Sequence, residues 1–255
     1  MNYIIAAGTD IGNAKDTNQD SFIAKTISTK QGRMVFAVIC DGMGGLAKGE
    51  VASATVVNAF SKWSETRLPQ LCEYEITDAE IRNEWVGIVT DYAEKIKNYG
   101  KRSGISLGTT VTAILLTDSR YYIINVGDTR AYEICDSVKL LTKDQTVVAR
   151  EIELGNMTEE EAKSDPRRSV LLQWIGASDA VYPDMFFGDT VQNAVYMLCS
   201  DGFRHEISEN EIYQYFQPSV MTNADVMKTN IDLLIEINKQ RQERDNISAL
   251  AIRTF

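Results

Sequence analysis

The sequence predicts an α+β fold, in which two antiparallel β-sheets pack face to face between helix pairs as an αββα sandwich with a flap insertion. Short apolar runs at residues 34–40 and 194–199 have the length and composition of strands buried on both faces. Segments with apolar residues at helical spacing come in pairs, one pair before and one after the middle strands. Strands and helices are therefore grouped and do not alternate strictly, which is typical of α+β folds.

The composition indicates one globular domain. The chain has 255 residues, of which 44% are hydrophobic and 24% charged, so we expect a single domain over residues 1–255 with a substantial core. Its net charge of -10 argues against nucleic-acid binding, which depends on Lys and Arg to neutralise phosphates.

The sequence shows no signal for export or for a membrane. No apolar stretch approaches the roughly 20 residues that a membrane span needs, and the start "MNYIIAAGTD" lacks the basic region of a signal peptide. The four cysteines form no C-x-x-C pair, which favours free thiols in a reducing compartment. We therefore expect a cytoplasmic protein that does not bind membranes.

The first part of the chain is interpreted as strands followed by a helix pair. Strands are expected at residues 2–7, 21–26 and 34–40, and helices at 49–63 and 77–99. Thr77 and Glu80 form a capping box at the start of the second helix, and Gly100 is expected to end it.

The rest of the chain is interpreted as strands, a flap and a second helix pair. Residues 109–116, 120–126, 129–135 and 139–141 indicate an antiparallel meander with tight connections. Residues 144–175 are helical but irregular, with a capping box at Thr158 and Glu161, and are interpreted as a surface flap. Further strands are expected at 181–187, 194–199 and 246–253, and further helices at 208–216 and 223–242.

Aspartates recur in the loops at strand ends, each beside a small or turn-forming residue: Asp20, Asp41, Asp128, Asp201 and Asp245. Any one alone is more often only a turn, and Asp128 in "VGDTR" could be a plain hairpin. Carboxylates brought to one place repel each other, so their recurrence predicts a cation between them. With one histidine, His205, and no cysteine cluster, oxygen ligation favours Mg²⁺ or Mn²⁺ over zinc.

Seven sequence motifs together resemble those of a known family: "DIGNAKDTNQDSF", "CDGMGGLAKGEVAS", "GTT", "NVGDTRAY", "LTKDQT", "CSDGF" and "RDNISAL". In their order and spacing the sequence resembles the metal-dependent protein serine/threonine phosphatases of type 2C (the PPM family), in their bacterial form. The motifs span nearly the whole chain. The fold of that family, a β-sandwich flanked by helix pairs, agrees with the pattern above.

The resemblance implies a role for each matching residue. Asp41 matches an aspartate that bridges two metal ions, and the Gly42 carbonyl matches a ligand of one of them. Asp201 and Asp245 match ligands of the other ion, and Asp20 matches an acid that acts directly or through a metal-bound water. The resemblance also implies roles for Asp128 and Lys15.

Asp128 matches a position that helps to hold a third, weaker metal ion. Lys15 stands where the family usually has a phosphate-binding arginine, and its point charge lacks the bidentate fork of arginine. The implied catalytic residues are Asp41, Asp201 and Lys15, with Lys15 also binding substrate. His205 is more often an ordinary surface or capping residue than a proton donor.

The implied reaction is hydrolysis of phosphoserine and phosphothreonine in proteins by a water that two Mn²⁺ or Mg²⁺ ions activate, with a third ion at Asp128 as an option. The implied partners are phosphorylated proteins, made by a serine/threonine kinase of the same cell, and the chain is expected to be a monomer. Two alternatives remain open. One is a non-catalytic phosphoprotein-binding domain of the same fold, and the other is a metal-dependent hydrolase of small phosphate esters.

Overall fold

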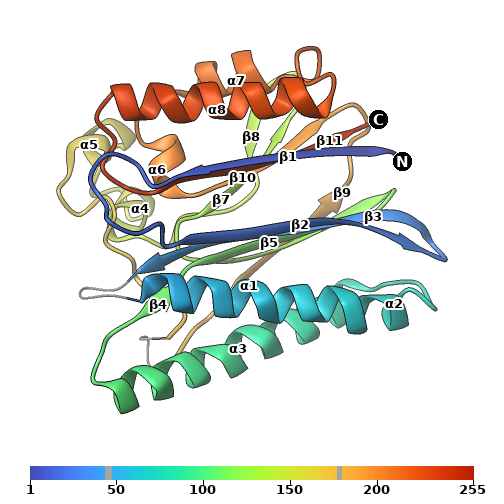
Figure 1. The fold of residues 1–255 in the computed structure, drawn as a ribbon, viewed down its shortest axis with the longest axis horizontal. Coiled ribbons are helices and arrows are strands. Elements are labelled where there is room, and N and C mark those ends of the chain that lie inside the picture. The colour runs from blue at the N-terminus through green and yellow to red at the C-terminus, as the bar shows by residue number, and fades with distance from the viewer. Residues whose placement is uncertain (44–47, 177–179) are drawn as a thin grey trace.

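The computed structural model describes residues 1–43, 48–176 and 180–255. Gly44 and Gly45 of the "CDGMGG" motif therefore lie outside the described residues. The described chain forms two stacked β-sheets between two layers of helices (Figure 1), which confirms the predicted αββα sandwich.

The first sheet has the strand order β2-β3-β5-β6-β9, and each neighbouring pair is antiparallel. Its strands are β2 (Asp20–Thr29), β3 (Gly32–Met43), β5 (Val111–Leu116), β6 (Arg120–Val126) and β9 (Asp184–Asp189), and the short β4 (Gly108–Thr109) pairs with the end of β3. Residues of β3 alternate between two cores. Met34, Phe36 and Val38 lie in the core beneath the helices, whereas Val35 and Ala37 lie in the core between the sheets. This alternation explains the continuous apolar run of β3.

The second sheet has the strand order β1-β11-β10-β7-β8 and is also antiparallel. Its strands are β1 (Tyr3–Asp10), β11 (Ile247–Thr254), β10 (Val195–Cys199), β7 (Arg130–Ile134) and β8 (Val138–Leu140). The buried side chains of Tyr196, Leu198 and Leu250 pack between the sheets. The first and last strands of the described chain are therefore neighbours.

The helices cover the outer faces of the sandwich (Figure 1). On the side of the first sheet lie α1 (Gly49–Thr66), the short α2 (Leu68–Leu71) and α3 (Asp78–Ser103); on the side of the second lie α6 (Asp201–Arg204), α7 (Glu209–Phe216) and α8 (Ala224–Gln240). Aromatic side chains fill the space under the first sheet, where Phe36 contacts Phe60, Trp63 and Trp85. The predicted pairing of long helices is confirmed, and the single-turn helices α2 and α6 were missed.

Two local expectations were wrong. The predicted meander is split, because β5 and β6 belong to the first sheet and β7 and β8 to the second. The chain crosses between the sheets at Gly127 and Asp128, so this motif is not a hairpin turn. Helix α3 continues through the buried Gly100 and ends before Gly104, whose positive φ of 64° provides the left-handed cap.

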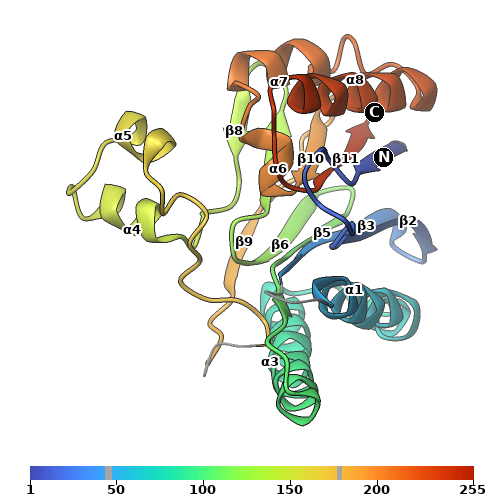
Figure 2. The same ribbon diagram turned by 60° about the vertical axis from the view of Figure 1, so that its left-hand side comes forward.

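The predicted flap contains two short helices, α4 (Val147–Glu153) and α5 (Glu159–Ser164). Figure 2 shows that both lie to one side of the sandwich, away from its layers. Thr158 and Glu161 form the predicted capping box. Among the described residues, no helix has the length and apolar character to cross a lipid bilayer.

Candidate metal and phosphate site

Asp20 and Asp41 meet at one end of the first sheet. They are directly opposite residues in the β2–β3 pairing. Asp41 is held by its backbone, because its N–H donates to Thr110 Oγ1 at 2.9 Å and its carbonyl accepts from the Thr110 N–H at 2.9 Å. Gly42 follows where a Cβ would collide with the carbonyl oxygen of Gly49, so only glycine allows this approach. Two carboxylates are thus fixed side by side on a rigid hairpin.

Asp201 and Asp245 are supplied by the second sheet. Asp201 begins α6 just after β10, and Asp245 lies just before β11, the strand that pairs with β10. The Asp201 side chain is almost buried, whereas that of Asp245 is one-third exposed. We call Asp20, Asp41, Asp201 and Asp245 the aspartate centre.

The charges of these residues act on one another. Burial, and then the charges of Asp201 and Asp245, raise the pKa of Asp20 to about 7, although the Ser200 and Ser248 hydroxyls oppose this shift. The pKa of Asp41 is raised well above its usual value by desolvation first and then by the neighbouring aspartates, Asp20 foremost. Without added positive charge the centre therefore disfavours its ionised state.

The donor set fits a hard divalent cation. Both carboxylate oxygens of Asp20 and the Oδ1 atom of Asp201 are buried and make no hydrogen bond of normal geometry among the described residues, although the Ser200 and Ser248 hydroxyls lie close enough to Asp20 to lower its pKa. Buried carboxylate oxygens normally have partners, so these three are available as ligands. In the described ranges, however, no three Asp, Glu, His or Cys side chains already form a compact ligand group.

Lys15 lies at the edge of the centre. Its Nζ is 2.6 Å from Asp245 Oδ1, and its side chain is 38% exposed. Burial alone would lower the pKa of Lys15, but Asp245, and then Asp41 and Asp201, raise it. The loop that carries Lys15 is held by Asn246, whose Nδ2 donates to the carbonyls of Ile11 at 2.9 Å and Thr17 at 3.2 Å. A partly exposed cationic side chain is thus placed beside the carboxylates.

His205 is the C-cap of α6, as the simpler expectation of a surface or capping residue allowed, but its side chain is not at the surface. Its side chain is 10% exposed, with Nε2 3.5 Å from Asp201 Oδ2 and Nδ1 3.3 Å from Glu243 Oε2. Burial alone would lower the pKa of His205, but Glu243 and Asp201 raise it. The sequence analysis missed Glu243 as a member of this group, although it lies two residues before Asp245.

Asp128 belongs to a different group, which the sequence analysis also missed. Arg204 Nη2 lies 3.6 Å from Asp128 Oδ2 and donates to Asp144 Oδ2 at 3.2 Å. Arg130 donates to both carboxylate oxygens of Asp144, from Nε at 2.8 Å and Nη2 at 2.7 Å. We call Asp128, Asp144, Arg130 and Arg204 the arginine network. The position of Arg204, three residues after Asp201, was the available signal.

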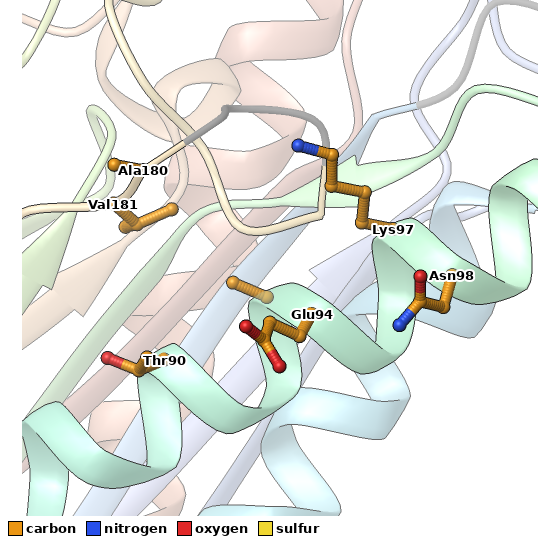
Figure 3. Close-up of a pocket in the computed structure, with 7 residues that line it drawn as sticks. Thr90, Glu94, Lys97, Asn98, Ala180 and Val181 are labelled. Atoms are coloured by element: carbon orange, nitrogen blue, oxygen red, sulfur yellow. The ribbon is translucent and has the colours of Figure 1, made fainter.

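A separate hollow of about 400 Å³ lies against α3. Figure 3 shows its lining residues, which come from α3 and from residues 180 and 181, and none is a loop-end aspartate. The chemistry of the aspartate centre therefore lies elsewhere, on the end of the sandwich.

Comparisons with known proteins identify the family. The family described as protein phosphatase 2C matches residues 7–234. The serine/threonine phosphatase stp of Listeria innocua is 28% identical over 93% of this chain and 97% of its own. The structure of a Streptococcus agalactiae serine/threonine phosphatase has a TM-score of 0.82 and 26% identity, and covers 100% of both chains. That of Mycobacterium tuberculosis PstP/Ppp has a TM-score of 0.79 and 26% identity, over 99% of this chain and 98% of its own.

The fold, with carboxylates gathered at one end of an αββα sandwich, is that of a PPM-type phosphatase. The chain belongs to the protein phosphatase 2C family, as the match over residues 7–234 shows. The family's catalytic mechanism is typically metal-dependent, in agreement with the donor set of the aspartate centre.

Proposed function

We propose that this chain removes phosphate from phosphoserine and phosphothreonine of proteins, and that the aspartate centre is its active site. The observation that carries the proposal is the convergence of four aspartates, with three buried carboxylate oxygens that have no partner among the described residues. Relatives named serine/threonine phosphatase support this choice of substrate.

The metal ligands that we propose are Asp41, Asp201, Asp245, Asp20 and the Gly42 carbonyl. Asp41 would be shared between two ions. When bound, Mn²⁺ or Mg²⁺ supplies Lewis acidity toward water and toward a phosphoryl oxygen. A similar fold, the catalytic domain of PstP, was solved with two manganese ions, so Mn²⁺ is the ion to test first. The assignment of Asp128 to a third ion stays a prediction, and its surroundings favour another role.

Lys15 is proposed to bind the substrate phosphate. Its exposed stem allows Nζ to leave Asp245 and reach a phosphate oxygen at the edge of the centre. There its charge offsets part of the negative charge that the transferring phosphoryl group carries. Asp41 and Asp201 would be catalytic because their carboxylates would hold the metal ions beside the reacting phosphoryl group.

The proposal also covers the extent of the domain, its partners and its location. The whole chain, residues 1–255, is taken as one phosphatase domain with residues 144–175 as its flap. A kinase of the same cell would supply its phosphoprotein substrates, and the chain would act in the cytoplasm as a monomer. The cysteines agree with a reducing compartment, because Cys40, Cys72, Cys135 and Cys199 are all free thiols.

The test is hydrolysis of a phosphothreonine peptide by the wild type with Mn²⁺, by the wild type with EDTA, and by Asp41→Asn with Mn²⁺. Asp189→Asn is the matched control, because that side chain is 92% exposed. We expect turnover only with Mn²⁺ and intact Asp41, and unchanged turnover in the control. No turnover by a folded, Mn²⁺-loaded wild type would favour the phosphoprotein-binding domain.

A second substrate comparison separates the remaining alternative. The peptide is compared with p-nitrophenyl phosphate and with bis-p-nitrophenyl phosphate under the same Mn²⁺ concentration. We expect the highest kcat/KM for the peptide. A preference for a small ester or for the diester would make the chain a different metal-dependent hydrolase.

A further inference from the structure

We propose that Arg204 is a built-in cation for Asp128, so that the chain binds two divalent ions at the aspartate centre and no third ion at Asp128. The inference rests on the proposed function, since it concerns how many ions the same active site takes. In this proposal Asp128 and Arg204 are positioning residues, each of which holds the other in place.

The guanidinium of Arg204 lies beside Asp128. Arg204 Nη2 lies 3.6 Å from the Oδ2 atom of Asp128 and donates to its backbone carbonyl at 3.2 Å. The Asp128 side chain is only 5% exposed, and that of Arg204 only 12%. A cation that approaches this carboxylate therefore meets a nearly buried positive charge of the protein itself.

Arg204 places a positive charge of the protein beside Asp128. A guanidinium does not lose its proton at accessible pH, so this charge is permanent. It lowers the pKa of Asp128, although burial and then the charge of Asp201 still raise that pKa to about 7. A divalent ion at Asp128 would add two charges beside the nearly buried guanidinium of Arg204, which is unfavourable.

The aspartate centre has less positive charge of its own beside its carboxylates. Its four aspartates face one paired lysine, Lys15, and the nearly buried His205 lies beside Asp201. Oxygens without partners occur in Asp20 and Asp201 among the described residues, whereas the Asp128 carboxylate has the guanidinium of Arg204 3.6 Å away. The structure thus offers ligands for cations at one group and an internal cation at the other.

The position of Arg204 also links the active site to the flap. Arg204 lies on α6, the helix that begins at Asp201, and its partner Asp144 lies at the base of the flap that carries α4 and α5. Arg130, on β7, holds Asp144 from the other side. The guanidinium of Arg204 therefore holds the base of the flap against the helix that carries Asp201. A bound ion exchanges with the solvent, so it would hold this contact less permanently.

The experiment counts bound Mn²⁺ by equilibrium dialysis, at a Mn²⁺ concentration that saturates turnover. We expect two ions per chain in the wild type and still two in Asp128→Asn, where Arg204 keeps its bond to Asp144. In Arg204→Met the exposed carboxylate of Asp128 should take a third ion, and in Arg204→Met/Asp128→Asn the count should return to two. Arg204→Lys, which keeps the charge, should bind two.

Three ions in the wild type and two in Asp128→Asn would overturn the inference, and so would a count of two in folded Arg204→Met. Asp128→Asn carries the test even where the methionine variant does not fold. Failure of the proposed function has a different signature. In that case the wild type binds no Mn²⁺ that Asp41→Asn removes, and the phosphothreonine peptide is not hydrolysed.

Discussion

Asp41 in the aspartate centre and Asp144 in the arginine network are buried carboxylates whose pKa values shift in opposite directions. Asp128, the other carboxylate of the network, resembles the centre, because burial and then the charge of Asp201 raise its pKa to about 7 although Arg204 opposes the shift. The pKa of Asp41 in the centre is raised, by desolvation and then by other aspartates including Asp128. The pKa of Asp144 in the network is lowered, because Arg204 and Arg130 outweigh the effect of its burial. The residue type is the same and both sites lack free access to water, so the partners decide the sign of the shift.

This difference shows what an aspartate at a strand end does and does not reveal. Such an aspartate marks a place where negative charge is concentrated. Whether a metal ion is needed to neutralise that charge depends on whether an arginine of the same chain is already paired with it. Variants that remove one charge at a time from each group test this difference.

The largest effect is expected from Asp201→Asn, which removes a charge from the aspartate centre without changing the shape of the side chain. Losing one preorganised electrostatic group typically costs about 10²–10³-fold in kcat, and loss of a metal ligand should cost at least that. The measurement is kcat on a phosphothreonine peptide at saturating Mn²⁺, with circular dichroism to establish folding. Near wild-type kcat in this variant would remove Asp201 from the active site.

The next effect is expected on stability from Arg204→Met. Removing one partner of a buried ion pair typically costs about 3–5 kcal/mol, and Arg204 serves both Asp128 and Asp144. Urea unfolding of the metal-free protein measures the change in free energy of unfolding. Arg204→Lys should lose less, because it retains the charge. A loss below about 1 kcal/mol in the methionine variant would place this arginine among weak surface pairs.

A smaller effect is expected from Lys15→Ala. The lysine is proposed to bind phosphate through a charge-assisted hydrogen bond, and such bonds contribute about 1.5–3 kcal/mol. KM for the phosphothreonine peptide should therefore rise at least about tenfold, since about 1.4 kcal/mol corresponds to a factor of ten. Lys15→Arg should lower KM, because its fork matches phosphate. An unchanged KM in Lys15→Ala would exclude this contact.

The smallest effect is expected in the pH dependence of stability. Asp144 has a folded-state pKa below its usual value of 3.8. It therefore contributes stability that is present above the unfolded pKa and is lost as pH falls through 3.8 toward the folded pKa. Asp144→Asn should flatten the loss of stability between about pH 5 and pH 3. Identical slopes in the variant and the wild type would mean that the arginines do not hold Asp144 ionised.

Much of the fold could be predicted from the sequence because its signals are local. The apolar run of β3 and the capping box at Thr77 each depend on neighbouring residues only, and these elements lie within a few residues of their predicted bounds. The meander was wrong because pairing is not local. Strands β6 and β7 follow each other closely, yet the crossing at Gly127 and Asp128 sends them to different sheets.

The same limit applies to the site. The gathering of Asp20, Asp41, Asp201 and Asp245 could be predicted, because each follows or precedes a recognisable strand. The pairing of Arg204 with Asp128 and Asp144 joins residues 76 and 60 positions apart in the chain. The local pattern shows only that Arg204 follows Asp201 by three residues, and it does not show which carboxylates Arg204 contacts. Nor does it show that Glu243 reaches His205.

The most direct test of the central claim, that the aspartate centre requires a cation, is thermal unfolding of the wild type, Asp41→Asn and Asp189→Asn with Mn²⁺ and with EDTA. Mn²⁺ at about 100 times its Kd should raise the Tm of the wild type and of Asp189→Asn by roughly 5–10 °C. The rise should be far smaller in Asp41→Asn. An equal rise in Asp41→Asn, or none in the wild type, would contradict the account.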